Sequence, residues 1–335
     1  LDWRDGNSIT GWGGLYVTAI TTLTNWQFVM SVPSFASAIT FQLKECISCL
    51  ILLNETTTHV GAGARVVFNA DQWTDSKVIV DQMNVQGSSL EFGDGGASTW
   101  TRSSVLVSRS FSKLDMKLYH STLTMEDSRM DITDSTSTGK FNVYISTVVR
   151  GALITATRST FAGAYGYAVL MGGGSQWLLQ TVTLTAASSW TGRVEETAAM
   201  RFYDSDVRDT FYFSSTQFKN ASLDIRRSSF SKSVPFSTRN TPDYAIRFHS
   251  GCTLLDTSFN LIDSNITSDR HGLFMYANVY VGIGSVLLIQ NTSLGGGCTG
   301  STCELMYNAM QVNINGGVLD WRDGNSITGW GGLYV

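Results

Sequence analysis

The most restrictive feature of the sequence is a segment that occurs twice, once at each end of the chain. Residues 1–17 read LDWRDGNSITGWGGLYV, and residues 319–335 read the same letters. The offset is 318 residues (319 − 1 = 318), and self-similarity at a fixed offset is typical of repeat architectures. We therefore expect residues 1–318 to form one complete repeat and residues 319–335 to be the first segment of the next identical repeat. A duplicated terminus without further copies is the alternative.

Short runs rich in Val, Ile, Thr, Ser, Phe and Tyr dominate the chain, and strands prefer these residue types. No stretch keeps apolar residues at the period of a helix over several turns. An antiparallel sandwich of 335 residues would need many tight hairpins, so we expect parallel strands instead. Dipeptides typical of hairpin turns are few: Asp5-Gly6, Asp94-Gly95 and Asn315-Gly316.

A finer pattern consists of an apolar residue, two residues of any type, a small polar residue, one residue of any type and a second apolar residue. Clear examples are Met125–Ser128–Met130, Phe202–Ser205–Val207, Ile225–Ser228–Phe230, Leu254–Thr257–Phe259, Leu261–Ser264–Ile266 and Ile289–Thr292–Leu294. The closing residues Phe161, Leu184, Val207 and Phe230 are 23 residues apart (184 − 161 = 207 − 184 = 230 − 207 = 23).

A period near 23 residues predicts an all-β fold, a parallel β-helix whose inward residues lie above one another about 4.8 Å apart. We expect it to be right-handed, as parallel crossovers are. We also expect the small polar residues at the bends, where they bond to neighbouring backbone groups. The series continues from Phe230 to Phe259 and Leu294 only with insertions, one of them over Pro235–Pro242. Residues 18–65 follow the pattern poorly, and no coils are predicted there.

The coil spacing over residues 66–294 resembles the parallel β-helix class of pectin-lyase-like and adhesin-like proteins. It is also loosely similar to giant tandem-repeat surface proteins of some protists and bacteria. The resemblance lies in the fold pattern alone, so it carries over no functional residue.

Charge and hydropathy exclude two classes of partner. The formal net charge is −4 and no Lys/Arg cluster is present, so we expect no nucleic-acid partner. No apolar run approaches the ~18 residues of a membrane helix. The densest run, Ile47 to Leu53, is interrupted by Ser48 and Cys49, so we expect no membrane span in this part of the protein.

Two features favour an extracellular, cell-surface location. Cys46 and Cys49 are three residues apart, and Cys298 and Cys303 bracket a Gly/Ser/Thr loop. Both pairs suggest local disulfides, because no His completes a zinc pattern. Cys252 is left over, either as a buried thiol or for pairing between copies. Candidate N-glycosylation sites with the N-x-[ST] pattern are Asn54, Asn220, Asn265 and Asn291.

Catalytic chemistry has little support. Polysaccharide lyases and hydrolases share the fold that the chain resembles, and glycosidic cleavage needs two facing carboxylates. Asp204 and Asp206 are the candidate carboxylates, and coil stacking would place Asp224 and several arginines near them. A solvated ladder of charges on an outer face explains this cluster better than catalysis does. His59, His120, His249 and His271 are isolated and suggest surface or bend positions. The Gly-rich segments 93–96, 172–174 and 295–297 lack a following Lys/Ser pair, and Asp94 alone is weak support for a Ca²⁺ site. We predict no catalytic, cofactor-binding or metal site.

Tryptophan is more frequent than the filling of a hydrophobic core requires. Trp26, Trp73, Trp100, Trp177 and Trp190 either pack in the coils or form sugar-stacking platforms. The repeat junction is expected to be covered by the duplicated pairs Trp3, Trp12, Trp321 and Trp330.

The sequence thus predicts a structural, non-catalytic repeat unit of an extracellular filament, hair or stalk, with neighbouring repeats of the same chain as partners. Lateral copies or glycans are further candidate partners. The alternative function is a carbohydrate-binding or adhesion module on the same scaffold, followed by a polysaccharide-degrading enzyme.

Overall fold

The computed structural model describes residues 2–3, 15–31, 38–58, 65–144, 147–232, 244–249, 251–268, 271–275, 280–296, 310–312, 314–328 and 333–334. Within these residues the regular structure is all strand, in parallel sheets stacked as a β-solenoid with turns of roughly 25 residues. The all-β parallel β-helix predicted from the sequence is therefore confirmed. The chain divides into two compact units, Leu1–Leu170 and Met171–Val335.

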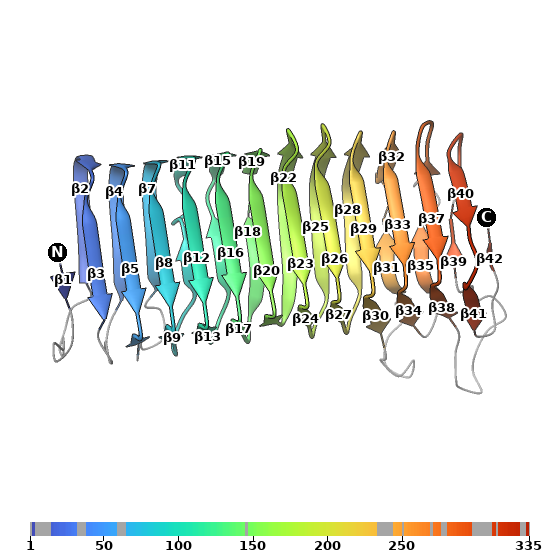
Figure 1. The fold of residues 1–335 in the computed structure, drawn as a ribbon, viewed down its shortest axis with the longest axis horizontal. Coiled ribbons are helices and arrows are strands. Elements are labelled where there is room, and N and C mark those ends of the chain that lie inside the picture. The colour runs from blue at the N-terminus through green and yellow to red at the C-terminus, as the bar shows by residue number, and fades with distance from the viewer. Residues whose placement is uncertain are drawn as a thin grey trace. The chain divides into compact units, whose positions relative to one another are not determined.

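The strands of the first unit form three parallel sheets within its described residues, and Figure 1 labels most of them. Sheet A contains β1 (Asp2–Trp3), β3 (Gln27–Ser31), β5 (Leu50–Asn54), β8 (Lys77–Asp81), β12 (Ser104–Ser108), β16 (Arg129–Thr133) and β20 (Leu153–Thr157). Sheet B contains β6 (Thr57–Thr58), β9 (Asn84–Val85), β13 (Phe111–Ser112), β17 (Thr136–Ser137) and β21 (Thr160–Phe161). Sheet C contains β2 (Leu15–Thr24), β4 (Ile39–Ile47), β7 (Val66–Thr74), β10 (Leu90–Phe92), β11 (Ala97–Thr101), β14 (Met116–Tyr119), β15 (Thr122–Glu126), β18 (Lys140–Tyr144), β19 (Thr147–Arg150) and β22 (Gly163–Gly172).

The second unit repeats this arrangement within its own described residues. Its sheet A contains β23 (Gln176–Gln180), β26 (Ala199–Tyr203), β29 (Ser222–Arg226), β33 (Ser258–Ile262), β37 (Val286–Gln290) and β40 (Val318–Trp321). Its sheet B contains β24 (Thr183–Leu184), β27 (Asp206–Val207), β30 (Ser229–Lys232), β34 (Asn265–Ser268), β38 (Ser293–Gly296) and β41 (Ser326–Thr328). Its sheet C contains β25 (Ser188–Glu195), β28 (Phe211–Lys219), β31 (Tyr244–Phe248), β32 (Thr253–Leu255), β35 (His271–Met275), β36 (Tyr280–Val281), β39 (Met310–Gln311) and β42 (Leu333–Tyr334).

Inward side chains stack on their equivalents in the next turn, because paired residues of neighbouring parallel strands point to the same face. In the first unit Ile51, Val78 and Val105 form one such buried column. Phe41, Phe68 and Phe92 form another, with centroids 5.3 and 5.4 Å apart and nearly parallel rings. A turn alone leaves its apolar face open, so each turn is stabilised by its neighbours.

The bends between strands carry the small polar residues as the sequence predicts. Ser76, Ser103 and Ser128 each follow a residue with positive φ and are buried. The Ser76 N–H donates to Ser103 Oγ at 3.1 Å, and the Ser103 N–H donates to Ser128 Oγ at 3.1 Å. Each hydroxyl also donates to the carbonyl two residues before it. These serine ladders satisfy backbone groups that no strand can pair at the bends.

The predicted column of the second unit is confirmed in part. Leu184 pairs with Val207 and Val207 with Phe230, as the 23-residue spacing predicts. The extension to Phe259 is wrong, because Phe230 pairs with Ile266 and Phe259 belongs to sheet A. The turn there is longer, with the bond from Ser228 N to Ser264 Oγ spanning 36 residues. The predicted insertion over residues 235–242 lies outside the described residues.

Residues 18–65, whose coils the sequence leaves unassigned, also contain paired strands of the solenoid within their described part. Strand β4 pairs along its length with β2 on one side and β7 on the other. The apolar-to-polar spacing is hidden there because β2 and β4 are long strands with a register shift between Ala19 and Thr22. Among the described residues no helix is long and apolar enough to cross a membrane.

Candidate functional site

The duplicated segment forms the same strand of sheet A in both of its copies. In the first copy Asp2 and Trp3 form β1, which pairs with the following strand β3 through Val29 and Met30. In the second copy Asp320 and Trp321 lie in β40. That strand pairs with the preceding strand β37, where Asp320 lies opposite Leu288 and Trp321 opposite Ile289. The two copies of this strand therefore pair through opposite edges, the first copy with the following strand and the second with the preceding strand.

Sheet C shows the same relation. In the first copy Leu15 begins β2 and pairs with Ile39 in the following turn. In the second copy the equivalent residue Leu333 pairs with Met310 in the preceding turn. An interior strand of a parallel sheet is paired along both edges, and each copy supplies the pairing that the other does not show.

The second copy also extends the ladder of bend residues. The Thr292 N–H donates to Asn325 Oδ1 at 2.9 Å, and Asn325 Nδ2 donates to the Ile289 carbonyl at 2.8 Å. Asn325 thus accepts a hydrogen bond from the Thr292 N–H, as Thr292 Oγ1 accepts one from the Ser264 N–H one turn earlier. The described residues of the duplicated segment therefore belong to the solenoid and continue its sheets and its ladder of bend residues.

The outermost strands carry exposed apolar side chains. In the second unit, Val318 is 54% exposed and Trp321 37% exposed on β40. In the first unit, Tyr16 is 65% exposed and Ile20 81% exposed on β2. Of the other predicted junction residues, Trp3 lies in β1, and Trp12 and Trp330 lie outside the described residues. The backbone edges of β1, β2, β40 and β42 and the side chain of Trp321, which lies over the buried Ile289, make up the candidate site, which we call the repeat seam.

The predicted glycosylation sites are all described. Asn220 and Asn291 are exposed bend residues with positive φ, and Asn265 is exposed on β34. Asn54 is half-buried at the end of β5. The Asn291 side chain donates to Asp263 Oδ1 at 2.7 Å.

Of the predicted cysteine pairs, Cys46 and Cys49 form a disulfide, with Cα atoms 5.7 Å apart. Cys298 and Cys303 lie outside the described residues. Cys252 is a buried free thiol, and burial raises its pKa.

The acidic residues considered for catalysis are held by arginines. Asp204 accepts bonds from Arg227 Nε at 2.6 Å and Nη2 at 3.0 Å, which lower the pKa of the carboxyl group. Asp206 accepts one from Arg208 Nε at 2.7 Å. The predicted solvated charge ladder is confirmed for Asp204 and Arg227, which lie on successive turns. Asp224 is buried on sheet A, whereas Asp206 lies on sheet B.

His120 lies at a bend, as predicted, but it is not a surface residue. Its side chain is fully buried against Trp100, with ring centroids 6.3 Å apart. Burial lowers the pKa of His120 to about 4, so the ring is neutral at pH 7. The sequence carries no signal for this, because His120 follows the outward Tyr119 at a bend whose direction the pattern does not define. His249 is half-buried, His271 lies in β35, and His59 lies outside the described residues.

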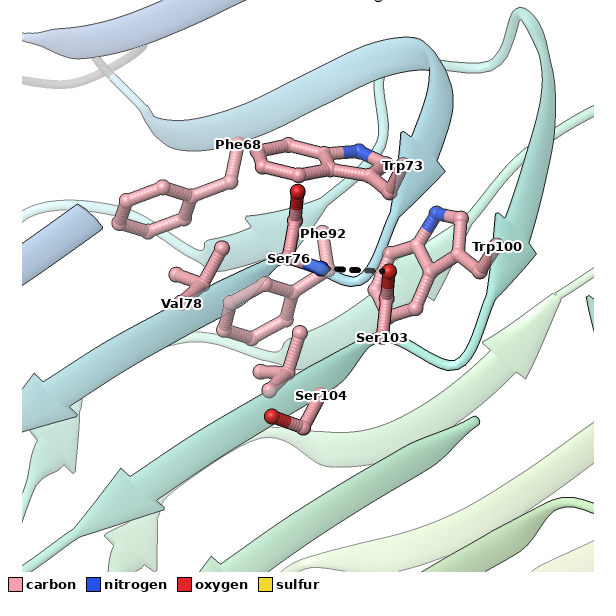
Figure 2. Close-up of a pocket in the computed structure, with 9 residues that line it drawn as sticks. Phe68, Trp73, Ser76, Val78, Phe92, Trp100, Ser103 and Ser104 are labelled. Atoms are coloured by element: carbon pink, nitrogen blue, oxygen red, sulfur yellow. Dashed lines mark hydrogen bonds between the residues drawn. The ribbon is translucent and has the colours of Figure 1, made fainter. Parts of the chain in front are cut away.

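Most of the tryptophans considered as sugar platforms belong to the core. Trp73, Trp100, Trp177 and Trp190 are at most 3% exposed, whereas Trp26 is half-buried. Figure 2 shows Trp73 and Trp100 around a small gap beside the bond from Ser76 to Ser103. The gap has room for no more than about one water molecule, so it is a packing feature and offers no ligand site.

Comparison of the chain with models of protein families, with curated proteins and with solved structures found no match. Within the described residues no cluster of His, Cys, Asp or Glu is arranged to hold a metal ion. The repeat seam is therefore the feature that offers most to a functional argument.

Proposed function

We propose that the chain is a structural repeat unit of an extracellular filament, hair or stalk of a giant tandem-repeat protein. Tandem copies stack end to end as one continuous parallel solenoid, and the unit has no catalytic role. The observation that carries the proposal is the repeat seam, where identical residues pair backward in one copy and forward in the other. Placing both pairings on one copy makes it an ordinary interior turn.

The register across the seam follows from the two copies. Asp320 keeps Leu288 on one side and gains the next repeat's equivalent of Val29 on the other. Leu333 keeps Met310 and gains the next repeat's equivalent of Ile39. Tension on such a filament runs through a covalent backbone and through stacked strands. Open sheet edges invite uncontrolled pairing with other chains, and the next repeat would cover the open edges of β40 and β42.

The extracellular location is supported by the exposed sequons and by the disulfide between Cys46 and Cys49. Disulfides persist in oxidising compartments. A direct check is the mass of the chain after secretion from a eukaryotic host, where glycans on Asn220, Asn265 or Asn291 would add mass. A secreted chain of unmodified mass would contradict the glycoprotein part of the proposal.

The seam itself is tested by hydrogen exchange at β40. The Val318 N–H donates to the Ser285 carbonyl and the Arg322 N–H to the Ile289 carbonyl, both at 2.9 Å. Amides alternate in direction along a strand, so the Leu319 and Trp321 amides point to the open edge.

The experiment compares the present chain with one in which residues 1–318 occur twice before the final segment. The seam segment alone carries the isotope label for NMR. In the longer chain we expect the Leu319 and Trp321 amides at the internal seam to exchange at least about tenfold more slowly. The Asp320 amide, which points to β37, is the control and is protected in both chains. Equal exchange of the Leu319 and Trp321 amides in the two chains would contradict the proposal.

A further inference from the structure

The outer face of sheet C in the first unit carries aromatic side chains in register. Tyr119 of β14 and Tyr167 of β22 occupy one register position two strands apart, since both pair with the same backbone position of β18 between them. Two residues earlier on these strands, Lys117, Asn142 and Tyr165 occupy the neighbouring position. Alternation along β14 and β22 turns Tyr119, Tyr165 and Tyr167 away from the core, since Leu118 and Gly166 beside them are buried. Asn142 in the second column is only 8% exposed.

The rings of this face are held in place by defined contacts. Gly95 lies against the Tyr119 ring, because a Cβ added to Gly95 would be 3.2 Å from Tyr119 Cε1. Tyr167 is 54% exposed. The ammonium of Lys140 lies 4.0 Å from the centroid of Tyr165. We call Lys117, Tyr119, Lys140, Asn142, Tyr165 and Tyr167 the tyrosine face.

Polar groups beside these rings are held by residues of neighbouring strands and loops. Lys117 Nζ donates to Glu91 at 3.0 Å and lies 5.8 Å from the Tyr119 centroid. The Glu91 carboxylate is buried and also accepts a bond from Arg65 at 3.1 Å. Asn142 Nδ2 donates to Asp115 Oδ2 at 3.0 Å. The face thus combines aromatic rings and their hydroxyls with ammonium groups that neighbouring side chains hold in place.

This combination matches the chemistry of a sugar chain. A pyranose ring has an apolar C–H face that packs on an aromatic ring and a rim of hydroxyls that bond to polar groups. Tyrosine supplies both an apolar body and a polar tip. A purely apolar partner would desolvate the ammonium groups of Lys117 and Lys140, which is costly.

The spacing selects the type of chain. Tyr119 and Tyr167 are two strands apart, a separation of about 10 Å at ~4.8 Å per strand. In an extended β-1,4-linked chain every second sugar presents the same face, and its two-sugar repeat is comparable to this separation. We propose that the tyrosine face binds an extended β-1,4-linked oligosaccharide that runs across the strands of sheet C, with Tyr119 and Tyr167 stacking on alternate sugars.

Calorimetric titration of the full chain with cellohexaose and chitohexaose tests the proposal, with the α-1,4-linked maltohexaose as a geometric control. We expect at least one β-1,4-linked probe to bind and maltohexaose not to bind. Tyr167→Ala should raise the dissociation constant about five- to tenfold, the value of one aromatic stacking contact. Tyr167→Phe should bind like the parent chain, because the ring remains.

The matched control is Tyr16→Ala, since Tyr16 is 65% exposed on the same sheet but outside the tyrosine face. It should leave binding unchanged. Circular dichroism of each variant verifies the fold. The proposal is overturned if neither β-1,4-linked probe binds or if maltohexaose binds equally well. It is also overturned if Tyr167→Ala has no effect or if Tyr16→Ala weakens binding as much.

Discussion

Ser228→Ala removes one rung of a serine ladder and leaves every apolar contact of the core in place. Ser228 is 3% exposed, accepts a bond from the Ser205 N–H at 3.1 Å and donates to the Arg226 carbonyl at 2.9 Å. The alanine variant leaves the buried Ser205 N–H without its acceptor. Removing one partner of a buried hydrogen bond costs about 1–3 kcal/mol. We expect the second unit to lose free energy of unfolding in that range.

Amide hydrogen exchange measures this loss at the place where it occurs. At about 1.4 kcal/mol per factor of ten, the Ser205 amide of the variant should exchange roughly five- to a hundredfold faster. Ser229→Ala is the matched control, because the neighbouring Ser229 is half-buried on β30 and its loss should change stability by less than about 0.5 kcal/mol. Equal exchange of Ser205 in the two variants would refute the role given to the ladders.

Three further predictions use matched residues or pH. Ile51 is buried and its neighbour Leu52 faces outward on β5, so Ile51→Ala should destabilise the first unit by about 2–5 kcal/mol and Leu52→Ala by much less, as urea unfolding would show. A Cβ at Gly93, with φ of 108°, would lie 2.2 Å from the Tyr119 carbonyl oxygen, whereas one at Gly96 meets only Asp94 Oδ1 at 3.4 Å. Gly93→Ala should therefore lower the melting temperature far more than Gly96→Ala. The pKa of His120 is lowered from 6.5 to about 4, so the stability gained from its neutral form is complete above pH 6.5 and is lost as the pH falls toward 4. That loss, a few kcal/mol, should vanish in His120→Phe, and an unchanged pH profile of urea midpoints in this variant would contradict the assignment.

The sequence was sufficient for the fold class because its signal is local. The bend serine and its flanking apolar residues recur wherever turns keep a similar length, as at Ser205 and Ser228. The series failed beyond Phe230, where one turn spans 36 residues and a fixed period no longer applies. A residue's partner one turn away is then set by insertion length, which a periodic pattern does not contain.

The candidate sites also differ in how far the sequence alone could predict them. The repeat seam follows from sequence identity alone, although the opposite edges used by Asp2 and Asp320 needed the structure. The tyrosine face was missed because Tyr119 and Tyr167 are 48 positions apart in the sequence (167 − 119 = 48). Only the pairing of both strands with β18 brings them to the same register position. The burial of His120 was missed because the direction of a bend residue depends on the loop packed against it.

The central claim is that this unit is followed by another copy of itself, and the coding sequence beyond Val335 tests it most directly. A long read through that end should continue with Thr-Ala-Ile-Thr, the residues that follow Val17, and then cycle through the repeat again. A stop or an unrelated sequence after Val335 would contradict the tandem filament and leave the duplicated turn without a successor.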